Sequence, residues 1–136
     1  MRSHLEFRSA ALLDFRSDED VPRGERVAAL LAAKLSDHGF RVERVHPEDW
    51  GWRIQLANAA FPLWIGCGHY QEYEDGHLCF IEPSKPFIRS WFRRVPTEDT
   101  VERLATVIER IIRADGSARE LSWWTPEDAA RGGPVP

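Results

Sequence analysis

The chain is poor in lysine and in net positive charge. Only Lys34 and Lys85 are lysines among its 18 basic residues, and the rest are arginines. An arginine and alanine bias of this kind is typical of a GC-rich bacterial genome and carries no functional information. Acidic side chains, 22 in number, outnumber the basic ones and give a net charge of -4. General nucleic-acid binding needs a basic footprint, so nucleic acid is the least favoured partner.

Long apolar runs are also missing. No run approaches the 18 or more residues that cross a bilayer, so we expect no membrane partner. The segment from Met1 to Arg8 lacks the continuous apolar stretch of a signal peptide. We therefore expect a cytoplasmic protein in which Cys67 and Cys79 stay reduced.

Motifs for catalysis and cofactor binding are likewise absent. The chain contains no Gly-x-Ser-x-Gly nucleophile motif, Walker loop, His-Glu-x-x-His zinc motif or Rossmann fingerprint. We therefore expect no cofactor, and a non-catalytic protein more readily than an enzyme. The sequence by itself indicates no particular reaction.

What the chain does contain is enough apolar material for one core. It has 136 residues, 43% of them hydrophobic, and a chain of this size buries about two-thirds of its surface on folding. We expect one domain over residues 1–136, frayed at 1–9 and at 131–136. Six tryptophans are the unusual part of the composition.

Apolar periodicity predicts a helix and a set of strands in the first two-thirds of the chain. Pro22–His38 carries apolar side chains at helical spacing and is followed by a glycine, which often ends a helix. From Phe40 to Pro83 the period changes towards two, which predicts four antiparallel strands. Asp75-Gly76 is typical of a two-residue hairpin turn. Ala10–Phe15, a short apolar run, is predicted to be an edge strand.

The last third begins with a segment rich in proline. Pro83–Pro96 contains three prolines and is predicted to be an irregular connection. Thr97 then caps a helix whose apolar stripe runs to Asp115-Gly116. The tail Leu121–Trp124 is predicted to be a short strand or a packing arm, and Thr125–Asp128 has the pattern that begins a terminal helix.

These elements follow the order (β)-α-β-β-β-β-α, with a tail. Two amphipathic helices on one face of a four- to five-stranded antiparallel sheet make a two-layer α+β sandwich. The order resembles the half-repeat of the TATA-binding-protein-like folds. This is a resemblance in topology alone, and a fold does not carry a function with it.

Cysteine and histidine gather in Cys67-Gly68-His69 and His77-Leu78-Cys79, which are ligand types that zinc uses. A two-residue turn at Asp75-Gly76 would place the two pairs on opposite faces of the hairpin. A three-residue turn would put all four on one face, but with His69 roughly 13 Å along the strand from the partner of His77. Neither arrangement surrounds one ion, so we predict no metal site. Cys67 and His69 remain a candidate reactive pair, because residues i and i+2 share a strand face.

The aromatic residues indicate a binding surface more directly. Trp50 and Trp52 flank a glycine at a predicted turn. Trp64 has the opposite strand parity to Leu63 and Ile65, so it is expected on the outer face with Tyr70 and a floor of small residues. An apolar outer face suggests a partner or ligand. The alternative is that the C-terminal Trp123-Trp124 arm or the connecting loop covers this face.

A second candidate surface is the proline-rich connection, where basic and aromatic side chains alternate. Arginine and aromatic residues are enriched at protein interfaces and also stack on single-stranded nucleic acid. The alternative is that the aromatic rings pack under the sheet edge while the basic groups stay in water. The candidate residues here are Lys85, Phe87, Arg89, Trp91, Phe92, Arg93 and Arg94.

These surfaces lead to a protein-binding or self-associating module, with a protein partner or a homodimer formed through the sheet face. One version is an immunity or antitoxin-type inhibitor, in which an acidic domain blocks a basic toxin. Another class is a small-molecule binder or enzyme with a cleft near four residues: Trp50, Trp52, Cys67 and His69.

Overall fold

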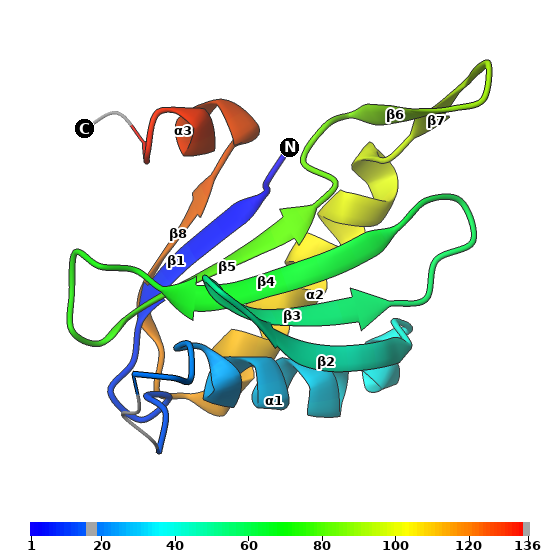
Figure 1. Ribbon diagram of the computed structural model, residues 1–136. Helices are drawn as coiled ribbons and strands as arrows, with labels where there is room; N and C mark the ends of the chain where they lie inside the picture. The colour runs from blue at the N-terminus through cyan, green and yellow to red at the C-terminus, as the bar shows by residue number, and fades with distance from the viewer. Residues whose placement is uncertain (16–18, 135–136) are drawn as a thin grey trace.

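Six strands form one antiparallel sheet in the computed structural model, which describes residues 1–15 and 19–134 (Figure 1). Their order across the sheet is β2-β3-β4-β5-β1-β8. A separate two-stranded sheet pairs β6 with β7. The strands are β1 (His4–Arg8), β2 (Val42–Glu48), β3 (Gly51–Leu56), β4 (Leu63–His69), β5 (Gly76–Glu82), β6 (Phe87–Ser90), β7 (Arg93–Pro96) and β8 (Arg119–Trp124).

The two long helices lie against one face of the large sheet (Figure 1). They are α1 (Glu25–Lys34), continued by the 3-10 turn η1 (Leu35–His38), and α2 (Glu98–Asp115). A short helix, α3 (Pro126–Ala130), follows β8. The predicted two-layer α+β architecture is confirmed, with more strands than expected. No helix among the described residues is long and apolar enough to cross a membrane.

The core lies between the helices and the inner face of the sheet. Every third or fourth residue of α2 is apolar and buried, because this spacing keeps one helix face towards the sheet. Gly116, at φ 83°, ends α2 in the left-handed conformation that glycine adopts without a steric cost. The sheet contributes alternate side chains to the same core, including Leu5, Phe7, Ile54, Leu56, Ile65 and Ile81.

The N-terminal prediction is wrong. Residues 1–9 are not frayed, because His4–Arg8 is a strand held between β5 and β8. Leu5 and Phe7 alternate with polar residues and are fully buried in the core. The run Ala10–Phe15, predicted as an edge strand, contains no strand. The strand therefore forms where two alternate side chains reach the core, and not at the more continuously apolar run, whose first two alanines are exposed.

The C-terminal tail forms the sixth strand of the sheet rather than an arm across it. Because side chains alternate along β8, its two tryptophans face opposite ways. Trp123 Nε1 donates to Glu109 of α2 at 2.8 Å, on the helix side. Trp124 Nε1 donates to Glu6 at 3.0 Å, on the outer side. Thr125 caps α3, as expected, in a reciprocal capping box with Asp128.

The connection between β4 and β5 is longer than predicted. Cys67 pairs with Cys79 and His69 with His77, which leaves Tyr70–Asp75 as a loop. Asp75-Gly76 is therefore not a two-residue turn: Gly76 is the first residue of β5, and Asp75 forms salt bridges with Arg8 and Arg119. A Cβ at Gly76 would lie 2.4 Å from the carbonyl oxygen of Tyr70, so close backbone approach explains the glycine.

Residues 83–96 are not irregular either. They form the β6–β7 hairpin, which projects beyond the sheet at the upper right of Figure 1. We call residues 83–96 the arm. At its base, Thr97 Oγ1 donates to the carbonyl of Lys85, and Thr97 N donates to the carbonyl of Pro86 at 3.0 Å. Ile88 and Val95 pack against the core, so the base is anchored while the tip extends away.

Candidate functional site

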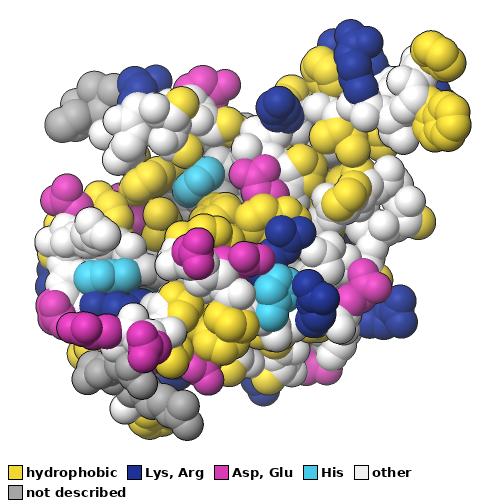
Figure 2. Space-filling view, in the orientation of Figure 1, with side chains coloured by type: hydrophobic (Ala, Val, Ile, Leu, Met, Phe, Trp, Pro, Cys, Tyr) yellow, Lys and Arg dark blue, Asp and Glu magenta, His cyan; other side chains and the backbone are white. Residues whose placement is uncertain are grey.

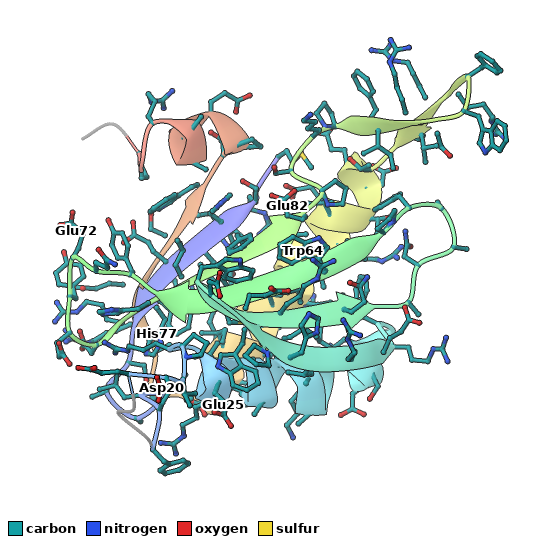
Figure 3. All side chains as sticks on the ribbon, in the orientation of Figure 1. Asp20, Glu25, Trp64, Glu72, His77 and Glu82 are labelled. Carbon is teal, nitrogen blue, oxygen red and sulfur yellow. The ribbon has the colours of Figure 1, made fainter. Side chains whose placement is uncertain are left out.

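The outer face of the sheet carries large aromatic side chains. Trp64 lies on this face, opposite to the buried Leu63 and Ile65, as its parity indicates. Figure 2 shows hydrophobic side chains gathered over the centre of the face, with acidic side chains among and around them. Trp64 and Glu82 are labelled on it in Figure 3 and are paired across β4 and β5. Among the described residues, neither long helix covers this face.

A continuous line of ring contacts crosses the outer face. Trp50, from the β2–β3 turn, has its ring centroid 5.9 Å from that of Trp64 and 5.1 Å from that of Phe80. His4 stacks between Phe80 at 5.5 Å and Trp124 at 5.8 Å. Tyr70 meets Trp124 edge-on at 5.7 Å. We call these six residues the aromatic row.

Glycines of β4 make room for the aromatic row. A Cβ at Gly66 would lie 2.2 Å from Cζ of Phe80, because the Phe80 ring rests directly on that glycine. A Cβ at Gly68 would lie 3.2 Å from the carbonyl oxygen of Trp50. The floor of small residues expected from strand parity is therefore present, and the row partly covers it.

Two adjoining hollows lie along the aromatic row. The first, of about 390 Å³, lies beside Trp50, Trp64 and Phe80. The second, of about 550 Å³, is bordered by Tyr70 and Trp124. Both are lined by His69 and Leu78, so they adjoin, and we call the two hollows together the outer groove. Ligand pockets occupy about 300–1,000 Å³, so each half is large enough for a side chain or small group.

The outer groove has an acidic border. Glu72 lines its second half, and Glu6 binds Trp124 Nε1. Burial raises the pKa of Tyr70, and the negative charges of Glu6 and Glu72 raise it further, so both carboxylates act at the groove. Glu82 lies opposite Trp64. A positive charge also lies beside Trp64, that of Arg53, whose guanidinium lies 4.0 Å from the centroid of the Trp64 ring.

The tip of the arm exposes two large aromatic side chains. Ser90 pairs with Arg93, so Trp91 and Phe92 form the turn between β6 and β7. They are 92% and 102% exposed, and the alternative that these rings pack under the sheet edge is therefore wrong. Phe87, the third aromatic residue of the arm, lies under Arg94, whose guanidinium is 3.8 Å from the ring centroid.

The arm is also the most basic part of the molecule. Residues 83–96 contain no acidic side chain, whereas the rest of the chain holds all 22 acidic residues and only 14 of the 18 basic ones. The arm's basic residues are Lys85, Arg89, Arg93 and Arg94.

The four residues of the predicted small-molecule cleft do not meet in one cleft. Trp50 lies on the outer face, whereas Trp52 points to the helix side and donates from Nε1 to the carbonyl of Pro22 at 2.9 Å. Cys67 is buried in the core beneath β4. His69 is at the end of β4, where its Nε2 donates to the carbonyl of Tyr73 at 2.8 Å.

The cysteines and histidines share one face of the β4–β5 pair, as a three-residue turn would also have placed them but a two-residue turn would not. The sulfur atoms of Cys67 and Cys79 lie 3.9 Å apart. His77 Nε2 donates to the carbonyl of Ser9 at 2.9 Å. Within residues 1–15 and 19–134, no three His, Cys, Asp or Glu side chains are arranged to hold a metal ion.

The geometry does not favour Cys67 as a nucleophile. The hydrogen bond with Cys79 and complete burial both raise the pKa of the Cys67 thiol. A reactive cysteine needs the opposite, a lowered pKa and some exposure. The other member of the candidate reactive pair, His69, has its hydrogen bonds with Arg23 and Tyr73.

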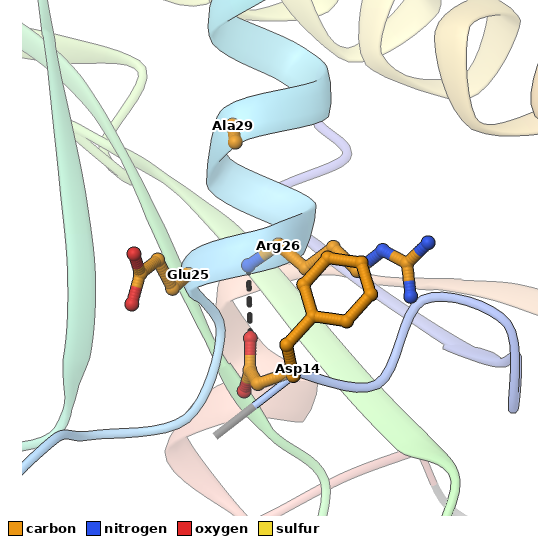
Figure 4. Close-up of a pocket in the computed structure, with 5 residues that line it drawn as sticks. Asp14, Glu25, Arg26 and Ala29 are labelled. Atoms are coloured by element: carbon orange, nitrogen blue, oxygen red, sulfur yellow. Dashed lines mark hydrogen bonds between the residues drawn. The ribbon is translucent and has the colours of Figure 1, made fainter.

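A further cavity, of about 310 Å³, lies at the start of α1 (Figure 4). Asp14 accepts hydrogen bonds there from the backbone N–H groups of Gly24 at 3.0 Å and Arg26 at 2.8 Å. The carboxylate therefore already occupies the position that an anion would take at this helix end.

Comparisons with protein-family models, curated proteins and solved structures found no match to this chain. The likeness to the TATA-binding-protein half-repeat therefore stays one of element order.

Sequence reasoning found Trp50, Trp64 and Tyr70 but missed the rest of the aromatic row. Phe80 shares a strand face with Leu78 and Glu82, and this alternation was a usable signal. His4 was missed because residues 1–9 were expected to be frayed. Trp124 was expected only as part of a tail that could cover this face, because its strand pairs with β1, more than a hundred residues earlier in the chain.

Proposed function

We propose that this chain is a non-catalytic protein-binding module whose outer groove takes a basic segment of a protein partner. The observation that carries the proposal is an aromatic groove with an acidic border on a sheet face that neither long helix covers. The free face of an antiparallel sheet is normally polar, and aromatic residues are enriched in the cores of interfaces.

The chemistry of the groove favours a cationic partner. Arginine and lysine are attracted to the faces of tryptophan and tyrosine rings and form strong hydrogen bonds with carboxylates. Arg53 already lies over Trp64 within this chain, which shows that the ring accepts a guanidinium. Glu6, Glu72 and Glu82 supply the opposite charge.

An immunity or antitoxin-type inhibitor of a basic toxin is a special case of the same proposal. Its support is that the acidic residues lie outside the arm, so the body presents a negative surface to a basic partner.

Titration with an arginine-rich peptide tests the groove, with the matched glutamate-rich peptide as the reverse-charge control. We expect the arginine peptide to bind in a salt-dependent manner. Trp64→Ala should weaken binding about tenfold, because a desolvated cation–π contact contributes up to about 2 kcal/mol. Glu82→Gln should weaken it by a smaller factor and leave the free energy of unfolding within about 0.5 kcal/mol of the unsubstituted protein.

Two exposed residues away from the groove provide matched controls. Phe15→Ala removes an exposed ring and Asp37→Asn an exposed carboxylate, so neither should change the affinity. Equal binding of the peptide by the Trp64→Ala and unsubstituted proteins would show that the groove is not the site.

A further inference from the structure

The arm and the outer groove of this chain are complementary in charge and alike in aromatic character. In Figure 1 the arm projects away from the sheet, so it does not fill the groove of its own chain. We infer that the arm of one copy docks in the outer groove of a second copy. This inference rests on the proposed function and names its partner: the same chain.

The residue types at the tip of the arm are not the ones that a hairpin turn favours. Trp91 has φ 59°, a left-handed conformation that tryptophan rarely adopts. Two-residue hairpin turns favour glycine or asparagine at such positions. Trp91 and Phe92 instead place large apolar surfaces in water at a strained turn. Aromatic side chains of this kind act as anchors when a partner buries them.

The outer groove has apolar walls that could bury the exposed rings of the tip. The half beside Trp50, Trp64 and Phe80 holds about 390 Å³, and its walls are rings against which an indole or phenyl ring can stack edge-on or offset. Glu82 lies beside this half, opposite Trp64.

The arginines next to the tip match the acidic border of the groove. Arg93 follows the two tip aromatics directly and Arg89 precedes them by two residues. A guanidinium forms paired hydrogen bonds with a carboxylate, so an inserted tip would bring Arg89 and Arg93 to the glutamates around the groove. This pairing would make the association sensitive to salt.

A second copy fits the observations better than an anionic polymer or membrane. The arm alone would suit either, but the chain carries a net charge of -4 and its groove is acidic, which repels a large anion. Both halves of the contact are present in every copy. Such a contact produces an exchanged pair if it closes and a longer assembly if it does not.

Paired variants and sedimentation velocity test this docking. The arm variant carries Trp91→Ser and Phe92→Ser, and the groove variant carries Trp64→Ala and Glu82→Gln. We expect the unsubstituted protein to sediment above the monomer mass, with the excess falling at low protein concentration and at high salt. Each variant alone should be monomeric at concentrations where the unsubstituted protein is not.

Mixing the two variants gives the decisive result. The arm variant keeps an intact groove and the groove variant keeps an intact arm, so an equal mixture should recover a one-to-one complex. A control carrying Phe15→Ala and Asp37→Asn should keep the mass of the unsubstituted protein. Circular dichroism checks that every variant retains the fold.

Several results would overturn the inference. A monomeric unsubstituted protein at the highest soluble concentration is one, and a mixture of variants that stays monomeric is another. Binding of phosphatidylserine vesicles or a single-stranded oligonucleotide that is lost in the arm variant would assign the arm to a different partner. The arginine-peptide titration, repeated in the arm variant, reports on the groove alone, so the proposed function can stand when self-docking fails.

Discussion

The two faces of the large sheet both carry apolar side chains, but the side chains differ in kind. The inner face is mainly aliphatic, and α1 and α2 seal it from water. The outer face carries the aromatic row, in which Trp124 Nε1 donates a hydrogen bond to Glu6. Aliphatic side chains gain most from complete burial, whereas rings with polar edges suit a surface that is buried only when a partner arrives. The inner face therefore stabilises the fold, and the outer face is the one for which we propose binding.

The largest expected effect comes from breaking the inner face. Ile65 and Trp64 are neighbours on β4 that point to opposite faces. Ile65→Ala leaves a cavity in the core and should lower the free energy of unfolding by about 2–5 kcal/mol. Urea denaturation followed by tryptophan fluorescence measures this loss. A cost below that of Trp64→Ala would contradict the assignment of stability to the inner face.

An intermediate effect is expected where the outer face is most tightly packed. Gly66→Ala places a methyl group on the Phe80 ring and should destabilise the fold by about 1–3 kcal/mol, because the ring must move. The double variant Gly66→Ala, Phe80→Ala should recover part of this loss, since the clash is removed. Additive losses in the denaturation experiment would show that the ring does not rest on the glycine.

The smallest expected effect is a pH dependence of the inner face. Burial lowers the pKa of His77, which lies in the core and donates to the carbonyl of Ser9. The folded protein therefore needs neutral His77, while the unfolded chain takes up a proton near pH 6.5. Stability should fall as the pH drops below about 6.5, at a rate of up to about 1.4 kcal/mol per pH unit for this group.

The corresponding variant identifies the group. His77→Gln should cost stability at pH 7 but flatten the decline between pH 7 and 5, whereas His38→Gln on the exposed η1 should not. Because burial also lowers the pKa of His4 on the outer face, a smaller decline should persist. An unchanged slope in the His77→Gln protein would contradict the role of this histidine.

Much of the fold was accessible from local patterns. The stripe of α2 and the glycine after it predicted that helix to within one residue, and strand parity placed Trp64 on the outer face. The β4–β5 register was not predictable in this way, because Asp75 is used for salt bridges rather than for a tight turn. The arm was predicted to be irregular because its three prolines are typical of loops, although two short strands form within it.

In the candidate site, too, some features follow from local sequence patterns and others only from long-range contacts. Strand parity is a local property, since successive side chains point to opposite faces whatever the strand pairs with. It therefore determined which residues could share a face, including Trp64 with Gly66 and Phe80 with Leu78. Which strands lie next to each other depends on contacts distant in sequence, and only the tertiary structure decided them. The insertion of β1 between β5 and β8 placed His4 between Phe80 and Trp124, and so joined separate aromatic residues into one groove.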